Sequence, residues 1–477
     1  MPIVLALIEG ALMFAALMVM LARTPAAAAV PSWAVPAFEA MVLTLACVGA
    51  FYYCDLYDLR IARNVRTCAP RLLKALALVL FSVAAANFFL PTRELTDALP
   101  VASVLLVAAA FPLGVRAACY GFIRTRPYAQ TVILVGGGRM ARMLADELSA
   151  RPHLRWAVGV VTDGLPAASG VSPFRYPVLG GLDRLPRIVD RIRPHRIVVS
   201  LPERKRADIM SVLLEARGRG IAVEDAVDVY ERITGKLAIE VVPAANLVFS
   251  KGFRDSRGPA LVGRIMSLTV ASIALVFTAP LLVVLALAVR LDSPGPIFFR
   301  QDRIGLHGRR FALIKFRTMR PVTAELSVWV RDNEDRITRV GRLLRKFRLD
   351  ELPQFWNVLR GDMNLVGPRP HPVVNYELFA REIPYYSLRA AVRPGVTGWA
   401  QVRYGYANNL DEETEKMRYD LYYVKHLSPW LDLRILADTV KVVLFGLGSR
   451  AADIGQPGLA AVPLINERRQ VTTEDAA

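Results

Sequence analysis

Cysteine is scarce in this chain and is confined to one part of it. The 477 residues include four cysteines, all in the first quarter of the sequence: Cys47, Cys54, Cys68 and Cys119. None forms a C-x-x-C pair of the kind that binds a metal, and the rest of the chain contains no cysteine. We therefore expect no disulfides, and the polar parts of the chain suit a reducing cytoplasm.

Positive charge is missing where a cleaved signal peptide would have it. No lysine or arginine precedes the first apolar stretch, Ile3–Leu21, although secretory signals begin with a basic region. Three more apolar stretches follow, at Val35–Tyr53, Leu72–Leu90 and Leu99–Ala118. Each is near the roughly 20 residues that cross a bilayer as a helix. Residues 1–122 are therefore expected to form a four-helix transmembrane module that acts as an anchor.

Basic residues orient this module. Five of them lie after the second stretch and at the start of the third, namely Arg60, Arg63, Arg66, Arg71 and Lys74. The other two short loops carry only Arg23 and Arg93. Because basic loops remain on the cytoplasmic side of a membrane, we expect a multi-pass protein whose soluble domains face the cytoplasm.

Acidic residues are outnumbered, and the net charge is +18. Such an excess fits either nucleic acid or anionic lipid together with phosphorylated substrates. The apolar stretches favour membrane lipid, and the cations accompany apolar helices instead of alternating with stacking aromatics. No nucleic-acid partner is expected.

Residues 128–250 are expected to form a Rossmann-like α/β domain. Thr131–Val135 reads as a buried strand, and Gly136–Ala141 follows it as G-x-G-x-x-A at the start of a helical pattern. This is the order of strand, glycine-rich turn and helix in dinucleotide-binding folds. Further strands are expected at Trp156–Val161, Arg196–Ser200 and Ile221–Val223.

The ligand of this domain is left open by the sequence. Gly136 and Gly138 would let a phosphate approach the backbone, and Asp163 lies about where an acid would bind a ribose. The same turn also serves close packing of a helix on a strand. No Tyr-x-x-x-Lys site for hydride transfer accompanies it, so nucleotide binding and a structural or dimerising role both stay open.

A fifth apolar segment, Ile265–Val289, contains Pro280. The simplest interpretation is a kinked transmembrane helix. However, basic residues flank both ends, namely Lys251, Arg254, Arg257 and Arg264 before it and Arg290, Arg300 and Arg303 after it. One end of a crossing helix should be poor in such residues. A break at Pro280 could return the chain to the side from which it entered, if protein shields the freed backbone groups. We expect a re-entrant helix.

Two adjacent carboxylates, Asp350 and Glu351, follow a basic amphipathic helix that begins near Ile337. That helix suits an anionic membrane surface. The pair either takes part in phosphate chemistry on a lipid or balances the nearby arginines, and the motifs around it favour the first. They are Gln301-x-Arg303-x-Gly305, Lys315-Phe316-Arg317, Leu352-Pro353-Gln354, Gly361-Asp362-Met363, Pro368-Arg369-Pro370, Arg393-Pro394-Gly395 and Ala400-Gln401.

This set of motifs, in this order, resembles the bacterial sugar transferases known as polyprenyl-phosphate hexose-1-phosphate transferases, the monotopic phosphoglycosyltransferases. The resemblance covers residues 255–447 and implies a mainly α-helical monotopic catalytic domain with a re-entrant helix. The membrane module and the Rossmann-like domain resemble the N-terminal half of the large members. Phe249–Phe253 resembles the subgroup linked to exopolysaccharide and PEP-CTERM export.

The resemblance implies a reaction. A sugar 1-phosphate moves from a UDP-sugar to undecaprenyl phosphate at the bacterial inner membrane, and UMP is released, as the first step of exopolysaccharide or other surface glycan synthesis. In the family the aspartate of the pair forms a covalent glycosyl-phosphate intermediate, and here that residue is Asp350. Glu351 is the metal-associated acid, and the pair would bind Mg²⁺, which prefers oxygen ligands and substrate phosphates. A homodimer is also expected.

Four cations are candidates for binding substrate phosphates: Arg369, Lys315, Arg317 and Arg303. Arg369 stands between two prolines and would present a fixed guanidinium fork to a phosphate. For Lys315 and Arg317, ordinary ion pairing is the alternative. His371 is a further candidate for substrate contact.

One residue departs from the family pattern, and the end of the chain carries no motif. Ala279 stands where a serine often precedes the helix-breaking proline, which removes a hydroxyl that could bind freed carbonyls. Leu431–Phe445 reads as an interfacial helix or as ordinary packing, and residues 448–477 as a loose tail.

Two other functions are alternatives to this enzyme. A membrane scaffold would sense a nucleotide with its middle domain and carry an inert C-terminal domain, which the intact motifs oppose. A membrane-attached nucleotide-sugar dehydratase would need a second dinucleotide domain with Tyr-x-x-x-Lys, and residues 255–477 contain no such motif. The sequence does not determine the sugar, because a few side chains of the pocket select it.

Overall fold

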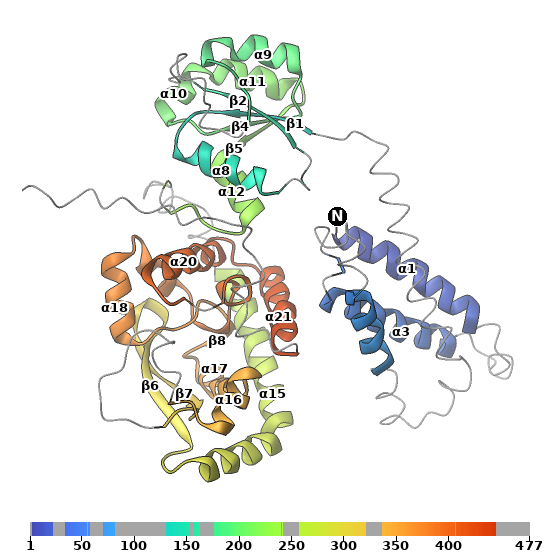
Figure 1. The fold of residues 1–477 in the computed structure, drawn as a ribbon, viewed down its shortest axis with the longest axis vertical. Coiled ribbons are helices and arrows are strands. Elements are labelled where there is room, and N and C mark those ends of the chain that lie inside the picture. The colour runs from blue at the N-terminus through green and yellow to red at the C-terminus, as the bar shows by residue number, and fades with distance from the viewer. Residues whose placement is uncertain are drawn as a thin grey trace, which may run out of the picture. The chain divides into compact units, whose positions relative to one another are not determined.

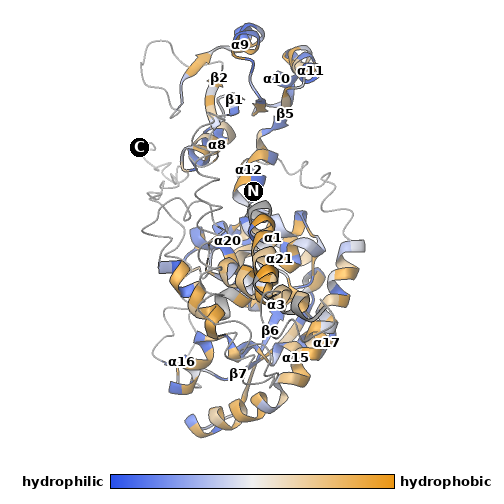
Figure 2. Ribbon diagram, turned by 90° about the vertical axis from the view of Figure 1, so that its right-hand side faces the viewer, coloured by the Kyte–Doolittle hydropathy of each residue, from blue (hydrophilic) through white to orange (hydrophobic). Residues whose placement is uncertain are grey.

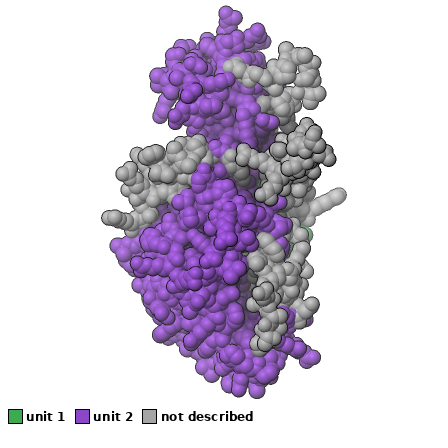
Figure 3. All heavy atoms as spheres, turned by 90° about the vertical axis from the view of Figure 1, so that its left-hand side faces the viewer, with its two compact units in different colours: residues 1–130, 151–157 green, residues 131–150, 158–477 purple. Residues whose placement is uncertain are grey.

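The computed structural model describes residues 2–21, 34–54, 56–57, 70–81, 130–151, 154, 156–162, 176–239, 241, 257–320, 336–405 and 407–444. The chain divides into two compact units, one of residues 1–130 with 151–157 and the other of residues 131–150 with 158–477. Figure 3 shows one face of the second unit in purple.

The first unit is built from apolar helices. α1 (Pro2–Leu21) packs against α3 (Ala34–Tyr53), and residues 70–81 are also helical. Met13 and Phe51 are fully buried in the core that these segments share. The first two predicted apolar stretches are therefore helices, and the third is helical over its described part.

The membrane topology of the first unit stays a prediction. Among the described residues, one helix is long and apolar enough to cross a membrane, Gly258–Asp292 in the second unit. The apolar parts of α1 and α3, Ala6–Val19 and Ala40–Tyr53, are shorter. The fourth predicted span, Leu99–Ala118, lies outside the described residues. The long apolar helix supports association with a membrane.

The second unit begins with the parallel α/β fold that the sequence predicts. Its strands stand in the order β3-β2-β1-β4-β5, and the pairs β2–β3, β1–β4 and β4–β5 are parallel. The strands are β1 (Gln130–Val135), β2 (Trp156–Val161), β3 (Val178–Gly180), β4 (Arg196–Val199) and β5 (Ala222–Asp225). All except β3 lie where the sequence places a strand. β3 was missed because three residues are too few to show a period.

Helices cover the sheet on both faces, as Figure 1 shows, with α9, α10 and α11 on one face and α8 and α12 on the other. This arrangement explains the run of buried residues Val132–Val135 in β1, because a parallel strand covered on both faces is apolar throughout. The helices are α8 (Arg139–Ser149), α9 (Leu185–Ile192), α10 (Glu203–Asp208), α11 (Met210–Gly218) and α12 (Ala226–Thr234).

The C-terminal part of the second unit begins with α15 (Arg257–Asp292), a 36-residue helix that contains Pro280. Pro280 has no N–H to donate to the carbonyl of Val276, and α15 changes direction along its length (Figure 1). The helix thus continues through the proline. Val276 and Phe277 are 74% and 79% exposed, and Figure 2 shows hydrophobic residues along much of the helix. Such a surface suits lipid, and re-entry stays a prediction.

Two short sheets and a set of helices complete the unit. β6 (Phe298–Ile304) pairs antiparallel with β7 (Arg310–Phe316), and β8 (Asn364–Val366) pairs parallel with β9 (Gly395–Thr397). The α-helices are α16 (Arg339–Lys346), α17 (Gln354–Arg360), α18 (Val373–Glu382), α19 (Trp399–Arg403), α20 (Leu410–Lys425) and α21 (Pro429–Leu444). The C-terminal part is thus mainly helical, and α21 covers the helix predicted near its end.

α16 leads directly to the acid pair, and its own sequence fixes its start. The Thr338 hydroxyl accepts from the backbone N–H of Gly341 at 3.0 Å, a normal cap for a helix. A Cβ on Gly341 would lie 2.2 Å from the carbonyl oxygen of Thr318, so only glycine fits there. Leu344 is fully buried, whereas Leu343 is exposed. α16 is therefore held against the segment that follows β7.

Candidate active site

The acid pair lies in a single 3-10 turn, Leu349–Glu351, between α16 and α17. Arg348 precedes the turn with a left-handed backbone, φ 56°, and Pro353 caps α17 after it. Both acidic side chains are turned inward, with Asp350 8% and Glu351 7% exposed. The sharp turn therefore places two charged groups inside the protein, where each needs a partner or shifts its pKa.

Two arginines hold Glu351. Its Oε1 accepts from Arg348 Nη1 at 3.1 Å and from Arg369 Nη2 at 2.8 Å. Burial alone would raise the pKa of Glu351, but Arg369, Arg348 and Lys315 outweigh it and lower the pKa well below its usual range. Glu351 is therefore a fixed, ionised carboxylate.

The surroundings of Asp350 differ from those of Glu351, because no arginine in the described part of the chain holds its Oδ1. Its Oδ1 is buried and has no hydrogen-bond partner among the described residues. Burial and the charge of Glu351 raise the pKa of Asp350, while Lys315 opposes the rise. Adjacent carboxylates with pKa values moved apart are typical of sites where each has its own role. Asp350 keeps an oxygen available for bonding.

Arg369, which stands between Pro368 and Pro370 in a loop, links the acid pair to α19. Besides Glu351, its guanidinium contacts Gln401, since Nη1 donates to Gln401 Oε1 at 3.0 Å. Gln401 in turn donates from Nε2 to the carbonyl of Val396 at 3.3 Å. The predicted phosphate-binding arginine is thus oriented from two sides, by Glu351 and by α19.

Arg303 supports the same loop from β6. Its Nη1 donates to the carbonyl of Pro370 at 2.9 Å, and its Nη2 donates to Gln301 Oε1 at 2.6 Å. Burial, followed by the charge of Arg369, lowers the pKa of Arg303 to about 9. The structure therefore brings Arg303 to the site as a support for the arginine loop.

Lys315 on β7 belongs to the same group of charges. Burial, followed by the nearby Arg369, lowers the pKa of Lys315 to about 7, while Glu351 and Asp350 act in the opposite sense. No hydrogen bond or ion pair joins its amine to another described residue. Lys315 is thus a cation available to an anionic ligand.

Arg317 has a different position from the other predicted cations. Its Nη1 donates to the carbonyl of Pro294 at 2.9 Å, and its Nη2 donates to the carbonyl of Ser293 at 2.6 Å. The side chain is buried. Arg317 therefore supports the turn that follows α15. Its contact with a substrate phosphate stays a prediction.

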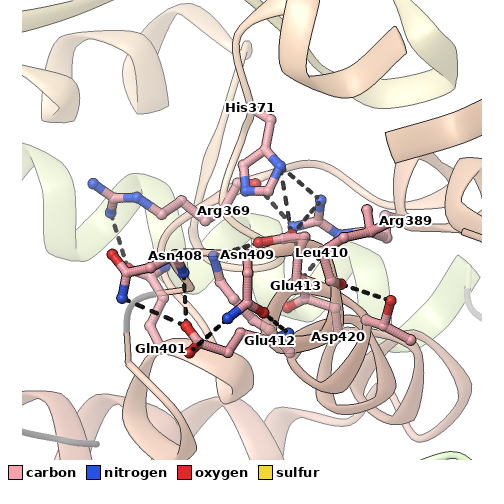
Figure 4. A network of polar contacts seen from close by, with 12 residues as sticks. Arg369, His371, Arg389, Gln401, Asn408, Asn409, Leu410, Glu412, Glu413 and Asp420 are labelled. Carbon is pink, nitrogen blue, oxygen red and sulfur yellow. Dashed lines mark hydrogen bonds and ion pairs between the residues drawn. The ribbon is translucent and has the colours of Figure 1, made fainter. Parts of the chain in front are cut away.

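A buried polar cluster lies behind the arginine loop and contains His371, which the sequence offers as a candidate for substrate contact, together with Tyr386, Arg389 and Asp420. Arg389 donates from Nε to Asp420 Oδ2 at 2.9 Å and from Nη2 to the carbonyl of Arg369 at 3.1 Å. The Tyr386 hydroxyl lies 2.6 Å from His371 Nδ1. Figure 4 shows His371, Arg389 and Asp420 converging in this network. Burial and Arg389 lower the pKa of His371 well below its usual value, so this histidine is a neutral partner within the cluster.

Members of the cluster stand far apart in the chain, and Arg389 belongs to none of the motifs around the acid pair. Its signal in the sequence is a lone arginine in Leu388–Ala391, which by itself is typical of a surface. A small hollow, partly open to solvent, lies beside the cluster and the arginine loop. It is lined by Ile304, Gly305, Pro368, Arg369, Pro370, His371, Tyr376, Arg389, Ala390, Val392 and Pro394. The hollow itself has room for roughly one water molecule.

The acid pair fits a divalent cation through the unpartnered Oδ1 of Asp350. The described residues contain no group of three acidic, histidine or cysteine side chains placed to hold a metal ion. Mg²⁺ is commonly bound by one or two carboxylates together with substrate phosphates and water. Asp350 thus offers one oxygen ligand to such an ion, to which a substrate phosphate would add others, and Mg²⁺ binding stays a prediction.

The glycine-rich turn of the middle domain has a packing explanation. A Cβ on Gly136 would lie 2.3 Å from the carbonyl oxygen of Ser200, and one on Gly137 would lie 2.3 Å from Thr162 Oγ1. Gly138 has open space around it and stands at the N-cap of α8. The third predicted nucleotide residue, Asp163, lies outside the described residues. Nucleotide binding in this domain stays a prediction.

Known proteins share the region that holds the site. A family model described as bacterial sugar transferase matches residues 259–446. The UDP-glucose:undecaprenyl-phosphate glucose-1-phosphate transferase of Escherichia coli (strain K12) is 33% identical over 331 residues, which cover 67% of this chain and 69% of that protein. The protein of the same name from Xanthomonas campestris pv. campestris is 35% identical over 327 residues, 66% of either chain.

A further relative is similar over a shorter region. The UDP-N-acetylgalactosamine-undecaprenyl-phosphate N-acetylgalactosaminephosphotransferase of Aeromonas hydrophila is 44% identical over 192 residues. That alignment covers 40% of this chain, and the chain spans 45% of the length of the Aeromonas protein.

Proposed function

Because the chain belongs to the bacterial sugar transferase family, we propose that it transfers a sugar 1-phosphate from a UDP-sugar to undecaprenyl phosphate and releases UMP. The names of its relatives support both substrates. The observation that carries the proposal is the buried acid pair. In it arginine holds Glu351, while Asp350 keeps a carboxylate oxygen without a partner among the described residues.

The reaction proceeds in two displacements at one phosphorus atom. A carboxylate oxygen of Asp350 forms a bond to the β-phosphorus of the UDP-sugar, and the bond from that phosphorus to the bridging oxygen breaks. UMP leaves with the electron pair. An oxygen of undecaprenyl phosphate then attacks the same phosphorus, and the Asp350 carboxylate departs unchanged. A covalent intermediate of this kind divides one exchange between two bulky substrates into two simpler steps.

The cations around the pair stabilise the charge that develops on the phosphoryl oxygens. Arg369 presents a guanidinium that Glu351 and Gln401 hold in one orientation, and Lys315 contributes an amine without a partner among the described residues. Groups fixed before the reaction lower the barrier because they need no reorganisation during it. A Mg²⁺ ion bound by Asp350 and Glu351 would neutralise diphosphate charge and help UMP to leave.

The membrane places the two substrates at one site. UDP-sugars are cytoplasmic and undecaprenyl phosphate is a lipid, so the acid pair must face the cytoplasm at the bilayer surface. The exposed apolar surface of α15 fits such a position. The lipid-linked product would begin an exopolysaccharide or another surface glycan. The relatives are named for glucose and for N-acetylgalactosamine, so both sugars belong in the test.

The test is UMP release from a panel of UDP-sugars by the purified protein in detergent with undecaprenyl phosphate. We expect activity with one of the sugars and none in Asp350→Asn, because an amide cannot form the acyl phosphate. Without the lipid acceptor, a UDP-sugar labelled in its β-phosphate should label the protein, and only when Asp350 is present.

Asp302→Asn is the matched control, since Asp302 is an exposed aspartate of the same module. It should release UMP at the rate of the unaltered protein. Turnover near that rate in Asp350→Asn would remove Asp350 as the nucleophile. No release from any UDP-sugar by the unaltered protein would refute the proposed function as a whole.

A further inference from the structure

The last helix of the middle domain ends against the catalytic part of the same unit. Gly235 directly follows α12 as its C-terminal cap, with a left-handed backbone of φ 69°. The carbonyl of Gly235 accepts a buried hydrogen bond of 2.9 Å from Trp399 Nε1, the first residue of α19. A Cβ on Gly235 would lie 3.0 Å from the indole ring. The contact is tight, and a larger residue at position 235 would move the tryptophan or the helix end.

Trp399 is held firmly from its other sides. The guanidinium of Arg403 lies 4.3 Å from its ring and that of Arg434 lies 5.4 Å from it. Tyr422 stacks on it with ring centroids 6.1 Å apart. The indole is 4% exposed. A ring confined in this way transmits a displacement to its own helix instead of rotating away.

Buried ion pairs dock α12 on α20 next to this contact. Glu231 of α12 is buried, and it accepts from Lys425 Nζ at 2.9 Å and lies 3.0 Å from His426 Nε2. Arg418 donates from Nη2 to the Tyr230 hydroxyl at 2.8 Å. Breaking one partner of such a pair is costly, because the other stays buried and unpaired. α12 is therefore a fixed support for α19 and α20.

α19 connects this support to the acid pair. Gln401 lies two residues after Trp399 in the same five-residue helix. Its Oε1 accepts from Arg369 Nη1 at 3.0 Å, and Arg369 Nη2 donates to Glu351 at 2.8 Å. The first residue of α19 thus contacts Gly235, and its third residue, Gln401, contacts Arg369.

We propose that Gly235 and Trp399 are positioning residues, through which the middle domain orients Arg369 for the substrate phosphate. Gln401 is the link between them and the arginine. The inference rests on the proposed function, in that Arg369 is taken to contact the UDP-sugar. It assigns to α12 a part in catalysis, although α12 contributes no group to the site itself.

Gly235→Ala tests the proposal against a matched control. Gly220→Ala places the same residue at another left-handed glycine of the middle domain, φ 83°, where nothing lies within 4 Å of the added carbon. Both variants strain the backbone, but only Gly235→Ala presses on Trp399. We expect kcat/KM for the UDP-sugar to fall about tenfold in Gly235→Ala, as expected when one charged contact is misplaced, and to stay within about twofold in Gly220→Ala. Trp399→Phe, which removes the indole donor and keeps a ring, should resemble Gly235→Ala.

Two readouts separate positioning from lost folding. A smaller folded fraction lowers kcat and leaves KM unchanged, whereas a displaced Arg369 also raises KM. The second readout is a double variant. Gly235→Ala combined with Gln401→Leu should have the same kcat/KM as Gln401→Leu alone, because both substitutions act through the same arginine. Distant, independent sites would instead give additive losses.

Three outcomes would each overturn the inference. They are additive losses in the double variant, an unchanged KM in both Gly235→Ala and Trp399→Phe, and equal kinetics in Gly235→Ala and Gly220→Ala. These outcomes are read against UMP release by the unaltered protein. A failure of the proposed function, which is no release by that protein, is therefore distinct from a failure of the inference.

Discussion

At the residue scale, two adjacent carboxylates acquire different chemistry from their neighbours. Glu351 accepts from two arginines, whereas Oδ1 of Asp350 has no partner among the described residues. The pKa of Glu351 falls and that of Asp350 rises. Arg369 is shared between Glu351 and Gln401, so the site is a network in which each charge fixes the next.

Lys315 should give this network a pH dependence. Because its pKa is lowered to about 7, its amine is charged below that pH and neutral above it. A neutral amine attracts a diphosphate less. We therefore expect kcat/KM for the UDP-sugar, which reports the free enzyme, to fall as the pH rises through about 7. Initial rates of UMP release at low UDP-sugar concentration, measured across that range, check the prediction.

Lys315→Arg is the control for this profile. Its guanidinium stays charged across the range, so a variant that retains activity should lack the fall. If the same fall occurs in Lys315→Arg, a group other than Lys315 is responsible for it.

At the element scale, α15 is tied to the catalytic part near both of its ends. Close to its start, Arg264 Nη1 donates to the carbonyl of Met363 at 2.8 Å. At its end, Asp292 Oδ2 accepts from the backbone N–H of Val340 at 3.0 Å. A straight helix of this length would extend over about 50 Å. Attachment of both ends to one module supports a helix that enters and leaves a membrane on the same side.

The chain also supplies a hydroxyl near the proline. Ala279, which precedes the proline, has no side-chain hydroxyl. Thr278 stands one residue before it, and its hydroxyl donates to the carbonyl of Ala274 at 2.7 Å. The change in direction of α15 thus needs no serine at position 279.

Labelling of single cysteines tests the topology of α15. In a background without the four native cysteines, Gly258→Cys and Arg300→Cys place thiols at the two ends. We expect both to react only from the cytoplasmic side in intact cells. In the same background, Pro280→Leu permits a continuous helix, and about 25 apolar residues at 1.5 Å each exceed the roughly 30 Å of the hydrocarbon core. That variant should partly invert or lose activity.

Labelling of one end from outside in the unaltered segment would show a crossing helix. It would also separate Asp350 from cytoplasmic UDP-sugar, and the proposed mechanism would be untenable.

At the scale of the whole molecule, the acid pair and the middle domain belong to one compact unit, while the N-terminal helices form another. The groups proposed for chemistry all come from residues 303–401. α12, however, bonds to α19 and α20 through Gly235 and Glu231. The middle domain therefore has a direct structural connection to the site.

Two deletions distinguish these contributions. Removal of residues 1–128 leaves the second unit whole, and UMP release in detergent should persist within about threefold of the full chain. Removal of residues 1–250 also takes away α12, and we expect a fall of about tenfold or more in kcat/KM. Circular dichroism and thermal unfolding establish that both proteins are folded. Equal activity of two folded deletions would show that α12 is dispensable for the reaction.

Much of this protein is determined by local sequence. Three strands of the middle domain, β1, β2 and β4, are mostly apolar runs. α16 begins at a threonine cap, and the acid pair follows a helix and precedes a proline. Each of these signals lies within a few residues, so it can be recognised in the sequence before the tertiary structure is known. The order of the motifs was enough to indicate the family that the comparisons show.

Only the tertiary structure decided what each charged group contacts. Arg317 and Arg303 looked alike in the sequence, but one supports the turn after α15 and the other the loop of Arg369. Gly235 meets Trp399 across 164 positions of the chain. Partners separated in this way leave no periodic trace, because a contact between distant residues is set by how helices and strands pack and not by the residues on either side of each partner.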